Sequence, residues 1–437
     1  MRDGIANTSE LSLDTWSTLT PEDRVAAFQQ MPFSEADDFF LSLSARDQSA
    51  LVLALPEGQR RIWVRLLPPD DATDLIQETP DEERAGLLNL LDEYTRREVV
   101  ALLAYAEDDA GGLMSPRFVR LRPDMTVDEA ITYLRRQAQQ VETIHYAYAL
   151  DSDQHLLGVV PLRRLMSAQK DQTVREIMRT DFTSVSDEMD QEALAKLFSE
   201  EHLLAIPVVD SEGRMKGIVT VDDIVNVVTE EASEDIQKIG GMEALEAPYL
   251  QAAFTEMVKK RGGWLAALFI GEMFTATAMG YFEEELARAV VLALFIPLII
   301  SSGGNSGSQA TSLVIRAMAL GEVRLRDWWR VVRRELGAGL ALGFMLGAIG
   351  LTRILVWQAF SHRYGEHYVL VASTVATSLI GVVLFGTLAG SMLPFVLRRL
   401  GFDPASASAP FVATLVDVTG LVIYFTVASI ILRGTLL

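Results

Sequence analysis

The sequence predicts a multi-domain, mainly α-helical membrane protein in which an acidic soluble portion precedes a five-helix transmembrane domain. The first observation is that charge and hydropathy separate along the chain. Its 437 residues have a net charge of −21 together with a positive mean hydropathy. Residues 259–437 carry 15 basic and 10 acidic side chains, whereas residues 1–258 carry 23 and 49. The other two observations are five apolar stretches in the basic portion, and helical patterning that gives way to strands and helices in the acidic one.

Composition excludes several kinds of site. A strongly acidic surface repels nucleic acid, which we do not expect as a partner, and attracts cations, although solubility alone also explains it. The chain has no cysteine, which excludes disulfides and thiolate metal sites. Its five histidines show no metal-ligand spacing. The first 16 residues lack the pattern of a signal peptide, so the portion before the first span is expected in the cytoplasm.

Residues 1–112 predict an acidic domain of short stacked helices, similar to a solenoid. Helix-start signals, in which Pro, Ser, Thr or Asp precedes acidic residues, recur roughly every dozen residues. They begin at Thr20, Ser34, Ser44, Pro56, Pro69, Thr79 and Asp92. Apolar residues then follow most of them at helical spacing.

Residues 113–229 predict an α/β domain with an internal repeat. The expected short strands are Phe118–Leu121, Tyr146–Leu150, Leu157–Val160, Ala205–Val209 and Ile218–Thr220. A helix start at Thr126 followed by a strand ending at Val160 makes one unit. The same order recurs loosely from Asp190 to Val219.

Residues 230–262 predict a connecting helix, with helical pattern from Asp222 to about Arg261. This helical pattern begins with a run of acids: Asp222, Asp223, Glu230, Glu231, Glu234 and Asp235. Like charges four residues apart destabilise a helix unless something neutralises them. A solvated face explains such a run, and cation-dependent gating is the alternative that its position before the membrane domain suggests.

Residues 263–437 contain five apolar stretches long enough to cross a hydrocarbon core of ~30 Å at ~1.5 Å per residue. They are Trp264–Tyr281, Ala289–Val314, Leu336–Trp357, Tyr368–Leu397 and Pro410–Leu432. The fourth has 30 residues with three glycines and a proline, which predicts a tilted or broken helix.

The distribution of basic residues predicts the orientation of these spans. Lysines and arginines precede the first span and fill the second and fourth connections, whereas the first connection carries Glu283, Glu284 and Glu285. The N-terminus is therefore expected in the cytoplasm and the C-terminus outside.

The second span contains a polar run, Ser301–Gln309, that makes a poor lipid-facing helix. Polar groups within spans face protein or a water-filled path, because exposure to lipid is costly. The run therefore predicts close helix packing with oxygens turned toward a pore. Its candidate ion-path residues are Gly303, Gly304, Asn305 and Gln309. A small-residue packing seam alone is the alternative.

The fifth span carries Asp417, about 10 Å beyond Pro410 at ~1.5 Å per residue. Arg353, the one basic residue within a span, lies near the far end of the third span and is a poor partner. A lone carboxylate at that depth needs a cation or a proton, and Mg²⁺ favours carboxylate oxygens while it keeps its waters. We therefore expect Asp417 to hold a hydrated ion, with Asn305 and Thr419 on the same path. A protonated structural Asp is the alternative, and Glu272 in the first span is a second intramembrane acid.

The soluble α/β domain resembles a pair of CBS (cystathionine β-synthase) domains, over Met114–Ser167 and Val174–Thr229. The resemblance lies in Ile206–Asp223, IPVVDSEGRMKGIVTVDD. It implies binding of ATP or another adenine nucleotide, whose ribose a Thr/Ser-x-x-Asp element holds. The second copy keeps that element as Thr220 and Asp223, whereas the first reads PLRR, from Pro161 to Arg164. A purely structural pair is the alternative.

The chain as a whole resembles the MgtE family of bacterial magnesium transporters over nearly its full length. Three motifs carry the resemblance: PLIISSGGNSGSQ from Pro297, ATLVDVTG from Ala413 and SEDIQKIG from Ser233. The resemblance implies a homodimeric, Mg²⁺-selective channel in the bacterial plasma (inner) membrane, in contact with lipid. Asp417 of both subunits would bind hydrated Mg²⁺ at the dimer axis, and Asn305 would line the path.

The resemblance also implies that cytosolic Mg²⁺ bridges acids of the soluble domains and closes the pore. The matching acids of the connector are Asp223, Glu231, Glu234 and Asp235, beside Asp222 and Glu230. In the helical domain the best-placed acids are Asp70, Asp71 and Asp74. Two departures bear on sensing and on selectivity at the pore entrance: Asn226 stands where another acid is expected, and Ala409 where an Asn can occur.

Two other functions are compatible with parts of the sequence. Gly304–Gly307 is similar to the GxSG of intramembrane serine proteases, but no span contains a histidine to serve as base. We therefore do not expect an enzyme. A CBS-regulated transporter of another divalent cation, Co²⁺ or Ca²⁺, is the nearer alternative. No nucleotide-hydrolysis motif is present, so ATP would regulate rather than drive transport.

Overall fold

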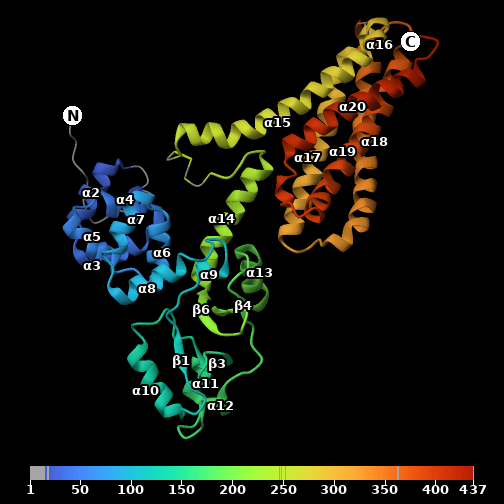
Figure 1. The fold of residues 1–437 in the computed structure, drawn as a ribbon. Coiled ribbons are helices and arrows are strands. Elements are labelled where there is room, and N and C mark those ends of the chain that lie inside the picture. The colour runs from blue at the N-terminus through green and yellow to red at the C-terminus, as the bar shows by residue number, and fades with distance from the viewer. Residues whose placement is uncertain are drawn as a thin grey trace. The chain divides into compact units, whose positions relative to one another are not determined.

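The structure is a computed structural model that describes residues 15–16, 19–245, 247, 249–250, 252–361 and 364–436. The chain divides into two compact units, Met1–Thr229 and Glu230–Leu437 (Figure 1). The first unit holds a helical domain and two small sheets, and the second holds the long apolar helices. Each unit is described by itself.

The helical domain consists of short helices that begin where the sequence signals place them. Its helices are α2 (Pro21–Gln30), α3 (Phe33–Leu41), α4 (Ala45–Ala54), α5 (Glu57–Val64), α6 (Pro69–Gln77), α7 (Asp81–Leu88) and α8 (Glu93–Leu102). The side chains of Thr20, Ser44 and Asp92 accept hydrogen bonds from the first turns of α2, α4 and α8. A core of aromatic and aliphatic side chains, with Phe40 and Trp63 in contact, joins the helices.

Two three-stranded sheets of the same topology follow, which confirms the predicted internal repeat. In the first, β1 (Val119–Leu121) pairs parallel with β2 (Tyr146–Leu150), and β2 pairs antiparallel with β3 (Leu156–Pro161). In the second, β4 (Val185–Ser186), β5 (Ala205–Val209) and β6 (Met215–Thr220) repeat this order. The two-residue strand β4 is too short to leave a pattern in the sequence. The accompanying helices are α9 (Ala110–Leu113), α10 (Val127–Gln137), α11 (Leu162–Ser167), α12 (Val174–Ile177) and α13 (Gln191–Glu201).

The connector is not the single helix that the sequence predicts. Helix α14 (Val221–Ile239) crosses the boundary between the two units and ends at Gly240 and Gly241. Gly241 has φ of +76°, a left-handed conformation that glycine adopts without steric cost and that ends helices. The next helix, α15, does not begin until Phe254, and the described residues between the two helices form neither helix nor strand.

The second unit contains five helices long and apolar enough to span a membrane, which confirms the predicted number. The candidate spans are α15 (Phe254–Tyr281), η2 with α17 (Val290–Ala319), η3 with α18 (Leu325–Ser361), α19 (Tyr368–Arg399) and α20 (Ala409–Ile431). A short acidic helix, α16 (Glu283–Arg288), and a 3-10 turn, η4 (Pro404–Ser406), lie in connections. Helix α19 is continuous, so of the predicted tilted or broken helix the broken form is excluded, and its glycines serve packing.

Close packing of α17 against α19 depends on facing glycines. A Cβ atom at Gly386 would overlap the carbonyl oxygen of Gly303, and one at Gly390 would overlap that of Gly307. Small residues let helix backbones approach closely in this way. The resulting van der Waals packing holds helices together in lipid, where the hydrophobic effect does not act between them. The hydroxyl of Thr311 extends the contact by donating to the Gly390 carbonyl oxygen at 2.9 Å.

The relative directions of the helices agree with five successive crossings. Contacts advance together along α17 and α19, from Gly303 with Gly386 to Gly307 with Gly390, so these helices run parallel. Contacts between α17 and α20 run in opposite order: Gly304 meets Ala413, and Ser308 donates to the Ala409 carbonyl oxygen at 3.1 Å. If successive spans cross the membrane in alternate directions, the second and fourth must run parallel and the fifth must run opposite to both, as these contacts show.

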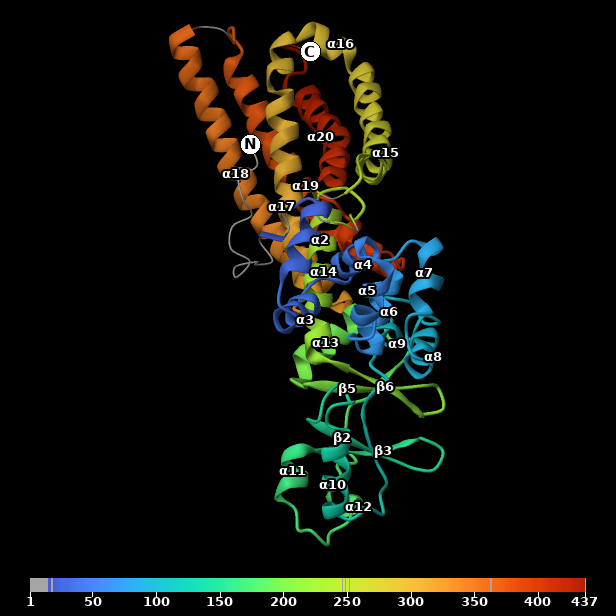
Figure 2. The same cartoon turned by 90° about the vertical axis from the view of Figure 1, so that its left-hand side faces the viewer.

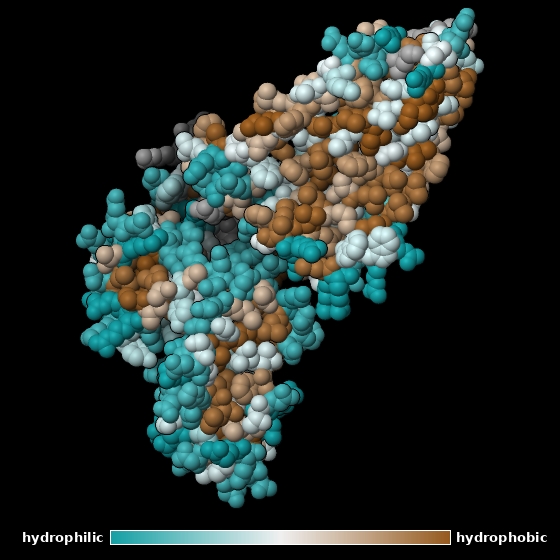
Figure 3. All heavy atoms as spheres, turned by 45° about the vertical axis from the view of Figure 1, so that its right-hand side comes forward, coloured by the Kyte–Doolittle hydropathy of each residue, from teal (hydrophilic) through white to brown (hydrophobic). Residues whose placement is uncertain are grey.

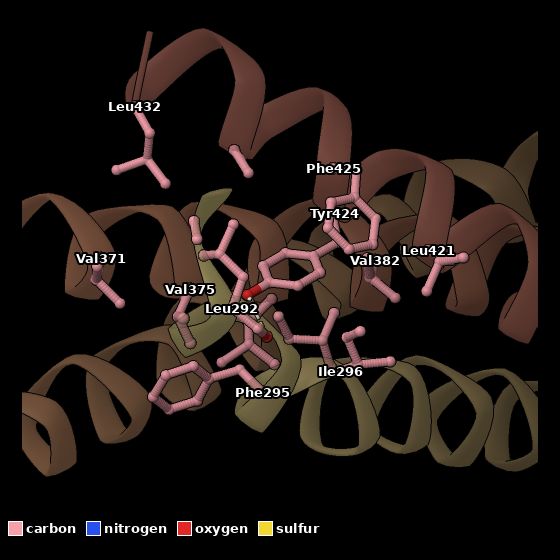
Figure 4. Close-up of a cluster of buried hydrophobic side chains, with 14 of the residues drawn as sticks. Leu292, Phe295, Ile296, Val371, Val375, Val382, Leu421, Tyr424, Phe425 and Leu432 are labelled. Carbon is pink, nitrogen blue, oxygen red and sulfur yellow. Dashed lines mark hydrogen bonds between the residues drawn. The ribbon is translucent and has the colours of Figure 1, made fainter. Parts of the chain in front are cut away.

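An apolar cluster fixes the other end of the bundle. Figure 4 shows the ring of Tyr424 from α20 among Leu292, Phe295 and Ile296. Its hydroxyl donates to the Leu292 carbonyl oxygen at 2.9 Å, which satisfies a backbone group near the start of the second span. The views agree that α15 lies beside α20 (Figure 1, Figure 2). The visible surface of this unit is a broad apolar face, bounded by hydrophilic side chains (Figure 3).

Replacing Gly386 with Ala tests the packing seam. The added methyl group has no room beside Gly303, so the free energy of unfolding should fall by ~1–3 kcal/mol. The matched control is Gly337→Ala in α18, where an added Cβ meets nothing within 4 Å. That variant should unfold at or slightly above the wild-type midpoint, because Ala gains up to ~1 kcal/mol of helix propensity over Gly. The measurement is thermal unfolding in detergent, and equal midpoints for both variants would contradict the seam.

Candidate ion path and ion-sensing sites

The two intramembrane acids lie together. Asp417 is half-buried on α20, and its carboxyl interacts directly with that of Glu272 on α15. Gly271 permits this approach, since a Cβ there would lie 2.9 Å from the side chain of Thr414, one turn before Asp417. Arg353 stacks on the Trp357 ring at 5.5 Å from its centroid. The structure therefore gives Glu272 a neighbour that the sequence could not identify.

The polar run of α17 divides between two faces of the helix. Gly303 and Gly304 are buried against α19 and α20, so they lie in the packing seam. Asn305 and Gln309 lie on the exposed side, where the Asn305 side-chain amide donates to the Ser301 hydroxyl at 3.4 Å. The glycines therefore belong to the packing seam, and the role of Asn305 and Gln309 on an ion path stays a prediction.

Polar side chains of α20 supply further oxygens near Asp417. The hydroxyl of Thr419 donates to the Leu415 carbonyl oxygen at 2.7 Å, which leaves its own lone pairs available. Asp417 lies eight residues after Ala409, where α20 begins, or ~12 Å along the axis. Asn305 lies nearer that end, because Gly304 packs on Ala413 and Ser308 bonds to Ala409.

In the described part of the chain, the serine of the protease-like sequence bonds to a hydroxyl and not to a base. The Ser306 hydroxyl is buried and bonds to the Thr387 hydroxyl at 2.7 Å. That partner cannot accept a proton as a general base does. Of the two histidines in the membrane portion of the sequence, His367 precedes α19, and His362 lies outside the described residues.

A second group of acids gathers in the soluble unit, where α6, the loop after α10 and the start of α14 meet. We name it the carboxylate cluster: Asp70, Asp71, Glu142, Asp222 and Asp223. Asp70 and Asp71 follow the proline that begins α6, and Asp223 caps the first turn of α14 through Thr220. Asp74, one turn further along α6, is half-buried.

Burial and neighbouring carboxylates raise the pKa of four members of the cluster. Burial, then Glu142, Asp71 and Asp223, raises the pKa of Asp70 well above its usual range. Burial and Asp222 raise the pKa of Asp71, and burial and Asp71 raise that of Glu142. Burial, with Asp222 and Glu142, raises the pKa of Asp223 to about 7 against the lowering effect of Thr220. The fold therefore disfavours the ionised form of these carboxyls, and a cation bound among them would stabilise that form.

One oxygen of Asp70 marks where a ligand would bind. Asp70 is 8% exposed, and its Oδ1 is buried without a hydrogen-bond partner. Buried carboxylate oxygens are rarely left in this state, and an ion or water is a usual explanation. Among the described residues, Asp151, Asp153 and His155 place three possible ligand atoms within 4.8 Å of one another. The oxygens of the carboxylate cluster are not packed as closely as this.

Glu142 is the member that the sequence analysis missed. It lies in the irregular segment between α10 and β2, and its side chain accepts from the Ser115 hydroxyl at 3.2 Å. No local pattern marks it, since only the pairing of the two sheets brings Ser115 and this loop beside α14. The isolated bridge between Ser115 and Ile218 provides that pairing.

The ribose-binding element predicted for the second CBS copy is formed, but its surroundings are acidic. The Thr220 hydroxyl donates to Asp223 Oδ2 at 2.8 Å. Asp223 is also a member of the carboxylate cluster, which repels phosphate groups and attracts cations. Of the two predicted roles of Asp223, the geometry favours the cation site.

The acids of α14 beyond the cluster approach the membrane helices. Glu234 forms an ion pair with Lys238, one turn later, and Lys238 pairs with Asp403 at 2.7 Å. Despite its partial burial, these two carboxylates raise the pKa of Lys238, which stays charged. Glu231 and Asp235 are half-buried and Glu230 is exposed on the same helix.

The end of α14 packs on the beginning of α20. A Cβ at Gly241 would meet Trp264 at 2.9 Å and Pro410 at 3.0 Å. The Trp264 indole donates to the Ser408 hydroxyl at 3.1 Å, and Ser408 caps the first turn of α20. We call these contacts, with the Lys238–Asp403 pair, the junction. The helix that carries sensing candidates is thereby attached to the helix that carries Asp417.

We expect Mg²⁺ to stabilise the protein in a pH-dependent way. The raised pKa of about 7 lets Asp223 keep its proton in the folded state up to about pH 7, whereas an unfolded Asp loses its proton near pH ~3.9. Without Mg²⁺, stability should therefore fall as pH rises through that window. Mg²⁺ replaces the protons, so the rise in melting temperature on adding Mg²⁺ should be largest above pH 7 and shrink below it.

Asp70→Asn tests this assignment, since it removes the most buried charge at nearly constant shape. The Mg²⁺-free variant should melt higher than wild type at pH 8 and should gain less from Mg²⁺. Glu82→Gln, an exposed position on α7, is the control and should behave as wild type. A Mg²⁺-dependent shift in Asp70→Asn equal to that of wild type would refute a cation at the cluster.

Comparisons with known proteins cover nearly the whole chain. A family model described as a divalent cation transporter, MgtE, matches residues 296–427, and one for the MgtE intracellular N domain matches residues 12–108. CBS domain models match residues 110–171 and 174–230. The matched regions contain Asp417, Asp70 and Asp223.

Several relatives are named as magnesium transporters. The chain is 40% identical over 97% of its length to the magnesium transporter MgtE of Thermus thermophilus, and covers 92% of that protein. It is 34% identical to that of Enterococcus faecalis, covering 77% of this chain and 72% of the relative. A crystal structure of the cytosolic domain of the Mg²⁺ channel MgtE in complex with ATP aligns over 49% of this chain and 88% of its own, at 39% identity and a TM-score of 0.47.

Proposed function

Because the chain belongs to the MgtE family of magnesium transporters, we propose that it is a channel admitting Mg²⁺ to the cytoplasm and closed by cytosolic Mg²⁺. The observation that carries the pore assignment is the pair of intramembrane carboxyls, Asp417 and Glu272. A negative potential of ~100 mV favours inward movement of two charges by about 4.6 kcal/mol, at ~2.3 per charge. No other energy source is then required.

Support for the ion path comes from its ligand chemistry. Carboxylate, amide and hydroxyl oxygens from Asp417, Asn305 and Thr419 suit a hydrated hard cation. Gln309 continues the exposed polar side of α17, while Gly303 and Gly304 let α17 approach α19 and α20. The exposed position of Asn305 in one subunit fits a path completed by a second copy, so we propose a homodimer.

Support for feedback comes from the placement of acids along α14. The helix begins in the carboxylate cluster, continues through Glu230, Glu231, Glu234 and Asp235, and ends at the junction. A cation that neutralises repelling carboxylates favours the arrangement in which they are close. Because α14 is continuous, that preference is transmitted to the start of α20. Asn226, exposed on α14, supplies no charge to this process.

We propose further that the protein lies in the plasma membrane with its soluble portion in the cytoplasm and its C-terminus outside. Basic connections and the alternating helix directions support this orientation. Adenine nucleotide at Thr220 and Asp223 stays a prediction for regulation, in competition with the cation there.

Transport of another divalent cation is the second candidate. The same oxygen ligands accept Co²⁺ or Ca²⁺, and Ala409 at the start of α20 offers no side-chain oxygen to discriminate among hydrated ions. Uptake of Mg²⁺ measured with and without competing Co²⁺ ranks the two cations.

Asp417→Ala tests the pore. Mg²⁺ flux through the purified protein in vesicles should fall at least about tenfold, because the variant lacks the carboxylate that would hold the hydrated ion within the membrane. Glu322→Ala, an exposed acid in the connection after α17, is the control and should conduct normally. Selective Mg²⁺ flux at the wild-type rate through Asp417→Ala would refute the assignment of Asp417 to the pore.

Neutralising Glu231, Glu234 and Asp235 together tests the feedback. The Mg²⁺ concentration that half-closes the pore should rise at least about fivefold, the low end of measured allosteric coupling. A matched variant neutralises three exposed acids of the second CBS repeat, Glu188, Glu200 and Glu201. If Mg²⁺ inhibits both variants as it does the wild type, the acids of α14 are only a solvated face.

A further inference from the structure

The two CBS repeats place residues of opposite charge at equivalent positions. Gly158 on β3 packs on the Arg179 carbonyl oxygen, as Gly217 on β6 packs on that of Ser115. From these glycines the chain reads GVVPLRR in the first repeat and GIVTVDD in the second. Arg163 and Arg164 thus occupy the positions that Asp222 and Asp223 occupy in the carboxylate cluster.

The first repeat has a cavity at this equivalent site. Its volume is about 780 Å³, and its basic lining consists of His145, Arg163, Arg164 and Arg179. We name it the arginine pocket. No Asp or Glu lines it, and in the described part of the chain none of its arginines has a carboxylate within 4 Å. Such a concentration of positive charge is unexpected in a portion of the chain with 49 acids and 23 bases.

Backbone hydrogen bonds hold the pocket in place. Arg179 exchanges two with Val159 of β3, each of 2.9 Å. The Leu162 N–H donates to the His145 carbonyl oxygen at 2.8 Å, which ties the loop before β2 to the start of α11. The Val221 N–H donates to the Leu204 carbonyl oxygen at 3.0 Å on the opposite wall. Unpaired arginines on a fixed frame are disposed to bind an anion with little reorganisation.

We propose that the arginine pocket binds an oligophosphate anion, read by charge and without recognition of ribose. Three guanidinium groups match several phosphates better than one, since each offers a planar pair of donors. The volume lies within the range of small-molecule sites, ~300–1,000 Å³, and exceeds what one phosphate fills. Arg164 stands where an Asp would accept from ribose hydroxyls, so nothing at that position selects a nucleoside. The proposal does not depend on the identity of the transported ion.

Calorimetric titration of the full-length protein in detergent, in Mg²⁺-free buffer, tests the proposal. The probes are inorganic tripolyphosphate, ATP, orthophosphate and adenosine. Tripolyphosphate and ATP should bind with similar affinity and compete, orthophosphate at least tenfold more weakly, and adenosine not measurably. Affinity for tripolyphosphate should fall as salt is raised, since screening weakens attraction between charges. No binding of tripolyphosphate, or adenosine binding as tightly as ATP, would overturn the proposal.

Variants locate the site. Arg163→Gln with Arg164→Gln should weaken tripolyphosphate binding at least tenfold, and Arg163→Glu with Arg164→Glu should abolish it. The control is Arg135→Glu with Arg136→Glu, an exposed basic pair at the end of α10 in the same repeat. It makes the same change in net charge and should leave the affinity within about twofold. Equal loss in the control pair would show that binding follows net charge rather than this pocket.

Discussion

The fold brings carboxylates beside other carboxylates, with little positive charge to compensate them. This arrangement raises the free energy of the folded state until a proton or a cation binds there. Asp70, with one buried oxygen unpartnered, shows this most clearly. Asp417 and Glu272 repeat the arrangement within the membrane helices. A protein that only had to fold would gain by replacing these groups, and this cost is the reason why we propose them as cation sites.

The remaining structure holds those carboxylates at fixed positions. Pro69 begins α6 and so places Asp70 and Asp71 in its first turn, and the Thr220 hydroxyl orients Asp223. Glycine contacts at Gly271 and Gly303 bring α15 and α17 close to neighbouring helices, which positions the polar residues beside them. The junction then attaches α14 to α20, so that the sensing candidates and the pore candidate share a mechanical connection.

The CBS pair shows how a repeated fold acquires two different chemistries. Both sheets have the same order and both place a glycine where the other repeat's backbone approaches. Because the backbones are equivalent, exchanging two acids for two arginines reverses the charge of the site without altering its frame. The pair thus offers a cation site and an anion site at related positions. This accounts for the absence of the ribose-binding aspartate from the first repeat, which sequence alone presents merely as a loss.

Sequence by itself determined the number of spans, the order of domains and most strands, and it named the candidate acids other than Glu142, because each of these depends on local periodicity, capping or composition. It also singled out Asp417, since a charge inside an apolar run is visible without a fold. Tertiary structure decided the partners. Glu272 meets Asp417, Glu142 joins Asp70, and Gly303 turns into a packing seam while Asn305 turns away, because such contacts join residues distant in sequence. The end of α14 at Gly241 also required the structure, since only the packing of that glycine on Trp264 and Pro410 fixes its left-handed conformation.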